Sequence, residues 1–200
     1  MTAHLGARLT DAEIVALFRR DPERFTLVYD RYFRDIYRYA AGRLDAQEAE
    51  DIAAETFLVA FDRRDRFDPA RGSLRVWLFG IATNLVARHR RKEARHYRAL
   101  ARAGAEPAAA SHEDWVVSAV AAGRMRPELA RALATLLTSG ERDVVLLVAL
   151  AQLSHEEVAE ALGISRGTVG SRLSRARRKL HTAIGHAAAD AAVDTEDVDE

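Results

Sequence analysis

Apolar residues recur at spacings of three and four positions along most of this chain, from Ile14 to Leu180. This is the period of an amphipathic α-helix, and no alternation long enough for a half-buried strand accompanies it. The clearest apolar stripe comprises Leu74, Trp77, Leu78, Ile81, Ala82, Leu85 and Val86. The pattern therefore predicts an all-α protein, with Trp77 on the core side of its helix.

Local signals predict three helices before that stripe. Thr10 and Glu13 have the spacing of a capping box, which satisfies two backbone N–H groups and starts a helix that runs through Phe18. A broad stripe predicts a core helix over residues 25–40, and a third helix spans residues 46–61. The stripe of the second helix comprises Phe25, Val28, Tyr29, Tyr32, Phe33, Ile36, Tyr37 and Ala40.

Composition divides the chain into two helical regions. Residues 67–73 form a loop by their Pro and Gly content, and Ser73 can cap the following helix. Residues 99–111 contain seven Ala, one Gly and one Pro and hold few large apolar groups, which is typical of a linker. We expect two small helical domains held apart by a flexible linker. Their bounds are 10–98 for the first domain, 99–125 for the linker, 126–184 for the second domain and 185–200 for an acidic disordered tail. Leu129, Leu133, Leu136, Leu137, Val144, Val145, Leu147, Val148 and Leu150 are expected to form the second core.

A helix-turn-helix is predicted over residues 154–179. Ser154 and Glu157 form a second capping box, Gly163 suits a left-handed helix end, and Ser165 can cap the next helix. That next helix is basic, as is a recognition helix that enters the major groove of DNA. Its expected DNA contacts are Arg166, Thr168, Ser171, Arg172, Arg175 and Arg178. The alternative is a helical hairpin whose basic face is merely solvated.

Charge is separated along the chain although the formal net charge is zero. Residues 63–102 hold twelve Arg or Lys against three acids, residues 166–181 hold six basic residues and no acid, and residues 190–200 hold six acids and no base. The acidic tail could shield the basic recognition helix, or it could simply aid solubility.

Other site classes find little support in the composition. The chain has no cysteine and its seven His are scattered, so we expect no disulfide, no metal site and no cofactor. No run of about eighteen apolar residues is present, and Asp11 and Glu13 stand where a secretory signal needs a basic flank. We expect a soluble, cytoplasmic protein that does not enter the membrane.

Three segments in order resemble the sigma-70 family of initiation factors, and in particular its extracytoplasmic-function (ECF) group. They are residues 49–57 (AEDIAAETF), 72–84 (GSLRVWLFGIATN) and 157–169 (EVAEALGISRGTV). The resemblance implies a region 2 domain that binds core RNA polymerase and opens the −10 element of promoter DNA. It also implies a region 4 domain whose helix-turn-helix reads the −35 element, and an anti-sigma factor as a further partner.

The resemblance also assigns roles to side chains. Glu48, Asp51 and Glu55, which lie along one line of the acidic helix, would contact the polymerase. The −10 contacts would be Arg71, Asn84, Arg88 and Arg91, and the loop 67–73 would accept an unstacked base. A solvated acidic face is the alternative for the carboxylates. No other chemical constellation accompanies them, so we do not expect an enzyme.

Two departures and one alternative remain. The recognition helix has Gly170 and Ser174 where family members carry larger residues, so its preferred DNA sequence cannot be transferred. The alternative function is an autonomous helix-turn-helix regulator, whose first hundred residues would sense a ligand or form a dimer. Dependence on core polymerase separates the two hypotheses.

Overall fold

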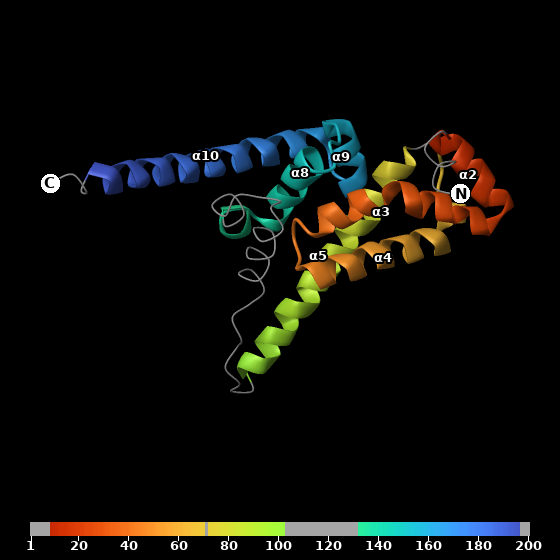
Figure 1. Ribbon diagram of the computed structural model, residues 1–200, viewed down its shortest axis with the longest axis horizontal. Coiled ribbons are helices and arrows are strands. Elements are labelled where there is room, and N and C mark those ends of the chain that lie inside the picture. Colours follow the sequence, from red (N-terminus) through yellow and green to blue (C-terminus); the bar gives the residue numbers. More distant parts are fainter. Residues whose placement is uncertain (1–8, 71, 103–131, 197–200) are drawn as a thin grey trace.

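The computed structural model describes residues 9–70, 72–102 and 132–196. Every regular element within these residues is a helix, which confirms the prediction of an all-α protein (Figure 1). The first half comprises α2 (Asp11–Arg20), the 3₁₀ turn η1 (Pro22–Phe25), α3 (Thr26–Ala40), α4 (Ala46–Asp62), the 3₁₀ turn η2 (Arg64–Arg66) and α5 (Leu74–Arg102). The second half comprises α8 (Ser139–Ala149), α9 (His155–Leu162) and α10 (Arg166–Glu196).

The N-terminal caps form as predicted. Thr10 Oγ1 accepts a hydrogen bond from the Glu13 N–H group at 3.3 Å, and Glu13 Oε2 accepts one from the Thr10 N–H group at 2.6 Å. Ser73 Oγ caps α5 by accepting from the Val76 N–H group at 3.2 Å. These side chains satisfy donors that the first turn of a helix leaves without a partner.

The core of the first half lies where α3, α4 and α5 pack on one another. The predicted stripe of α3 is partly wrong, because Tyr29 is 42% exposed while Leu27 and Tyr39 are buried. Helix α3 has neighbours on several sides, so its buried arc is centred on Val28, Ile36 and Tyr39. Tyr29 stacks on a neighbouring ring of its own helix at the edge of this arc.

The core of the second half is smaller. Val144, Leu147, Val158, Val169 and Leu173 are its central side chains, and all are buried. The prediction that Leu136 belongs to this core is wrong, because its side chain is 40% exposed. Leu136 lies in the turn before α8. Because the chain is no longer helical there, the helical spacing that predicted its burial does not apply.

Two helices run across the expected domain bounds. Helix α5 continues through Arg102, past the expected domain end at residue 98, and α10 continues through Glu196, into the tail that was expected to be disordered. Both segments are rich in Ala and other strong helix formers, so they extend helices that tertiary contacts have already started. The rest of the predicted linker, with a candidate helix over residues 113–122, lies outside the described residues.

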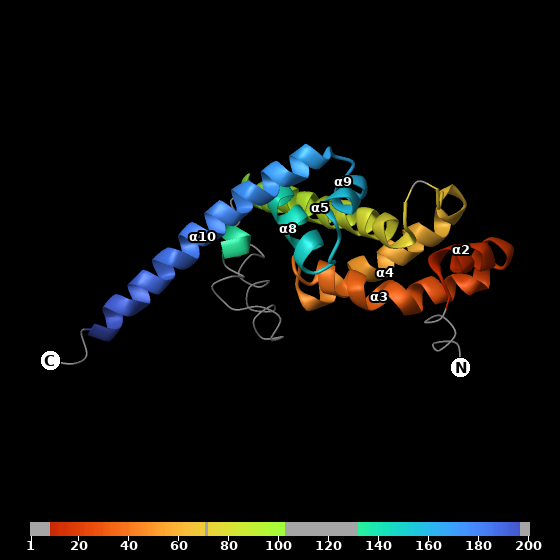
Figure 2. The same cartoon turned by 90° about the horizontal axis from the view of Figure 1, so that it is seen from above.

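The two halves are in contact, contrary to the expectation that a linker holds them apart. Helix α9 packs against α5, and the two views agree on this placement (Figures 1 and 2). The backbones of α5 and α9 come close at Gly80, where a Cβ atom would lie 2.9 Å from the carbonyl oxygen of Ala161. Arg43, which is 1% exposed, forms an ion pair with Asp143 of α8. Partly buried apolar side chains of α9 join a core cluster that also includes residues of the first half.

Candidate nucleic-acid interface

Helices α9 and α10 form the predicted helix-turn-helix. Ser154 Oγ accepts a hydrogen bond from the Glu157 N–H group at 3.2 Å, which completes the capping box of α9. Gly163 ends that helix in the left-handed conformation, with φ 62° and ψ 35°. Ser165 Oγ then accepts from the Thr168 N–H group at 3.1 Å and caps α10. Each local signal read from the sequence is therefore confirmed.

The outer face of α10 carries the predicted DNA contacts. Arg166 is paired with Glu156 at 2.8 Å, but its side chain remains 73% exposed. Ser171 and Arg178 are exposed, whereas Thr168 and Arg172 are half-buried. The Thr168 hydroxyl lies 2.9 Å from Ser165 Oγ. The face is thus accessible near its start and basic along its length.

Arg175 has a second environment that the sequence analysis missed. Its Nε donates to Glu141 Oε1 at 3.3 Å, and Lys179 Nζ donates to Glu141 Oε2 at 2.7 Å. Glu141 is 3% exposed and also accepts from the Thr138 N–H group at 3.0 Å, within a capping box of α8. The hydrogen bond from Lys179, with further ones from Thr138, lowers the pKa of Glu141 to about 2. The Thr138 and Glu141 spacing was the signal that could have revealed this anchor.

Helix α5 presents Asn84, Arg88 and Arg91 to solvent, while Arg71 lies outside the described residues. A cavity of about 360 Å³ adjoins Asn84 and the end of the loop 67–73. Its walls include Phe67 and Trp77, whose ring centroids lie 5.1 Å apart, and Ala161 of α9. Trp77 is half-buried and lines this cavity, so its assignment to the core is only partly correct.

A second cavity, of about 570 Å³, lies between α5 and α8. Its basic lining consists of Arg43, Arg88, Arg90, Arg91 and Arg95. Arg88 and Arg91, which were predicted as contacts to the −10 element, therefore belong to a continuous group of guanidinium groups. Such a group favours binding of phosphate oxygens.

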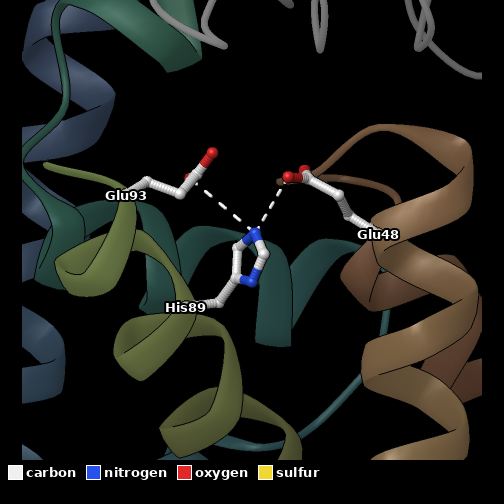
Figure 3. Close-up of side chains that lie close together, drawn as sticks. All are labelled: Glu48, His89 and Glu93. Atoms are coloured by element: carbon white, nitrogen blue, oxygen red, sulfur yellow. Dashed lines mark hydrogen bonds and ion pairs between the residues drawn. The ribbon is translucent and has the colours of Figure 1, made fainter. Parts of the chain in front are cut away.

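The three carboxylates of α4 that were predicted to contact the polymerase lie in two different environments. Asp51 and Glu55 are exposed, but Glu48 is half-buried and its Oε1 lies 2.9 Å from His89 Nε2 of α5 (Figure 3). Leu58, which the sequence analysis did not select, is 66% exposed on the face of Asp51 and Glu55. Its position seven residues after Asp51 was the available signal, because such spacing returns to the same helix face.

Both halves of the chain match models of known protein families. "Sigma-70 region 2" matches residues 28–96, and "Sigma-70, region 4" matches residues 127–180, together more than half of the chain. The probable RNA polymerase sigma-C factor of Mycobacterium bovis is 34% identical over 151 residues, which cover 74% of this chain and 76% of the relative. The chain belongs to the sigma-70 family.

Further relatives place this sigma factor in the ECF group. The ECF RNA polymerase sigma factor SigW of Bacillus subtilis is 33% identical over 171 residues, which cover 80% of this chain and 88% of the relative. The solved structure of CnrH in complex with the cytosolic domain of CnrY matches with a TM-score of 0.63 and 25% identity, over 88% of this chain and 97% of that one. The sigma factor RpoE of Bartonella quintana, solved with the anti-sigma factor NepR, has the same fold, with a TM-score of 0.62 and 22% identity, over 80% of this chain and 96% of that one.

Family membership decides between the two functions expected from the sequence. The region 2 match covers the segment in which an autonomous regulator would carry its sensing or dimerisation domain, so that alternative is not favoured. Within the described residues, no helix is long and apolar enough to cross a membrane.

Proposed function

We propose that this sigma factor divides its work among three helices: α10 reads the −35 element, α5 contacts and opens the −10 element, and α4 binds core RNA polymerase. Because the chain belongs to the ECF group, it directs promoter-specific initiation of transcription. The main support for the proposed DNA contacts is the helix-turn-helix, because the basic face of its second helix is open to solvent.

The role of α10 is supported by the chemistry of that face. Arg can form paired hydrogen bonds to guanine in the major groove, and Ser or Thr can contact either bases or phosphates. Arg166, Thr168, Ser171, Arg172 and Arg178 form the proposed set. Arg175 contributes to it only in part, because Glu141 holds its guanidinium group against α8.

The role of α5 is supported by the cavity beside Asn84 and by the basic lining around Arg88 and Arg91. An amide can read a base edge, while guanidinium groups hold phosphates in place. The cavity borders the loop that we expected to accept an unstacked base. Aromatic walls at Phe67 and Trp77 could stack on such a base.

The role of α4 is supported by Asp51, Glu55 and Leu58, which form one exposed face. An apolar side chain surrounded by carboxylates fits a partner surface that is basic at its rim and apolar at its centre. Glu48 lies at the edge of this face, turned toward α5.

The partners and place of action follow from the relatives. CnrH is solved with the cytosolic domain of CnrY, and RpoE with the anti-sigma factor NepR, so we infer an anti-sigma partner for this chain as well. We place its action in the cytoplasm, where the polymerase performs the catalysis and the sigma factor supplies specificity.

Transcription by core polymerase on a genomic promoter library tests this function. Adding the purified chain should create start sites that core polymerase alone does not use. If the chain only changed transcription driven by another sigma factor, the autonomous-regulator hypothesis would replace the proposal.

Two variants test the division of work. The double substitution Asp51→Lys and Glu55→Lys should weaken core binding by about tenfold or more, because it reverses the charge of the proposed docking face. Glu50→Lys is a matched control, since this exposed residue lies about 100° around the same helix from Asp51. Equal losses in both variants would contradict the assigned face.

A further inference from the structure

Three side chains that can ligate a metal meet where α4 packs on α5. His89 and Glu93 lie one turn apart on α5, and Glu48 faces them from α4 (Figure 3). Nε2 of the imidazole lies 2.9 Å from Glu48 Oε1 and 3.8 Å from Glu93 Oε2. One atom from each of the three residues falls within 4.8 Å of the other two.

Hydrogen bonding alone leaves this arrangement incomplete. Nε2 carries at most one proton and is within hydrogen-bonding distance of Glu48, whereas the Glu93 oxygen lies beyond that range. Two carboxylates therefore converge on one imidazole nitrogen. A small movement of these side chains would bring one atom of each within reach of a shared cation.

The cluster is both oriented and reachable. Glu48 Oε2 accepts a hydrogen bond from the Asp45 N–H group at 3.4 Å in the capping box of α4, which turns Oε1 toward His89. Such outer contacts fix the direction of a metal ligand. The side chains of Glu48, His89 and Glu93 are 23%, 28% and 21% exposed, so an ion can enter without unfolding the helices.

Charge favours a divalent ion over a monovalent one. A divalent ion balances the charge of two carboxylate ligands, whereas a monovalent ion balances only one. Asp45 adds negative charge nearby and Arg90 opposes it, since both interact electrostatically with Glu93. The cluster is therefore surrounded by charges of both signs.

We propose that Glu48, His89 and Glu93 bind one Zn²⁺ ion that links α4 to α5. Zinc accepts imidazole nitrogen and carboxylate oxygen together, whereas Mg²⁺ and Ca²⁺ prefer oxygen ligands alone. Ligands on facing helices, including a pair within one turn, are how helical bundles hold metals in their cores. Three protein ligands leave a fourth position for water. The proposal does not depend on the functions assigned to the three helices.

Titration of the full chain with ZnCl₂ by isothermal calorimetry tests the site. The wild type should bind one equivalent, and excess MgCl₂ should not displace it. His89→Ala and Glu93→Gln should each weaken binding by at least about tenfold, because each removes one of three ligands. His181→Ala is the matched control, since this exposed imidazole lies on α10 and should leave binding unchanged.

A spectroscopic measurement separates ligand loss from misfolding. Co²⁺ bound in place of Zn²⁺ should give visible absorption bands, and Glu93→Gln should change them while its circular dichroism stays that of the wild type. The absence of zinc binding in the wild type would overturn the proposal. Equal affinity in the wild type and in both ligand variants would overturn it as well.

Discussion

Glu141 connects two helices of the second half through one buried carboxylate. It receives hydrogen bonds from the Thr138 N–H group, from Arg175 and from Lys179, and so ties the start of α8 to the middle of α10. A buried acid is stabilising only when such partners compensate its lost hydration. Two of these partners lie on the helix proposed to read DNA, so Glu141 also sets the direction of that helix.

Replacement of this carboxylate should be costly. Glu141→Gln should lower the free energy of unfolding by about 2 kcal/mol, because hydrogen bonds to a charged group contribute more than neutral ones. Urea denaturation checks this. Glu157→Gln, at the same position of the α9 capping box but half-buried, is the control and should cost about 1 kcal/mol or less. Equal costs would argue against a special role for the ion pairs.

The contribution of Glu141 to stability should be lost at low pH. Because the pKa of Glu141 falls from 4.5 to about 2 in the folded chain, its contribution to stability is complete above about pH 4.5 and is lost as the pH falls toward 2. Denaturation at pH 6 and pH 3 should therefore show a smaller loss of stability in Glu141→Gln than in the wild type. Parallel losses would show that other carboxylates dominate the acid sensitivity.

At the scale of single elements, helix starts were the best predicted features. The capping boxes at Thr10 and Ser154 and the left-handed Gly163 are local, so the sequence contains all the information that they need. Helix ends were predicted less well. Helices α5 and α10 both continue into segments that composition had assigned to a linker and a tail, because these segments are rich in Ala, a residue of high helix propensity.

Two glycines of the helix-turn-helix should respond in opposite directions. At Gly170 a Cβ atom meets nothing within 4 Å, so Gly170→Ala should raise stability by about 0.5 to 1 kcal/mol through helix propensity. Gly163 has φ +62°, so Gly163→Ala should lower stability by about 1 kcal/mol. Thermal unfolding should show shifts of about 2 to 4 °C per kcal/mol for a chain of this size. Stabilisation by both substitutions would contradict the left-handed helix end.

At the scale of the whole molecule, the contact between the halves was the feature that the sequence did not predict. Nothing in the sequence singled out Arg43, and Gly80 was only one residue of a family motif. Their roles appear only when α5 meets α9 and the end of α3 meets α8. The candidate site was limited in the same way, because contacts between distant segments do not follow from local sequence. The exposure of Asp51 and Arg166 follows from helix periodicity. The partners of Glu48 and Arg175, in contrast, come from distant segments.

Opening of this contact is measurable because the chain has no native cysteine. Spin labels at Glu55→Cys and Ser174→Cys, both exposed, would report the distance between α4 and α10. Gly80→Val should lengthen that distance, since even a Cβ atom there lies too close to the Ala161 carbonyl oxygen. Gly167→Val is the control, because a Cβ atom at that exposed position comes no closer than 3.9 Å to a neighbouring side chain. An unchanged distance in Gly80→Val would show that the helices adjust locally.

The cavity beside Asn84 gains a particular property from this contact. One of its walls is α9, so the complete cavity exists only while the two halves touch. A small molecule that needed all of its walls would bind only while the halves touch, and it would stabilise that arrangement by RT ln(1 + [L]/Kd). Such a compound would hold the half proposed to read the −35 element against the half proposed to open the −10 element. Because the same cavity borders the loop proposed to accept an unstacked base, such a compound would also compete with promoter DNA for this space.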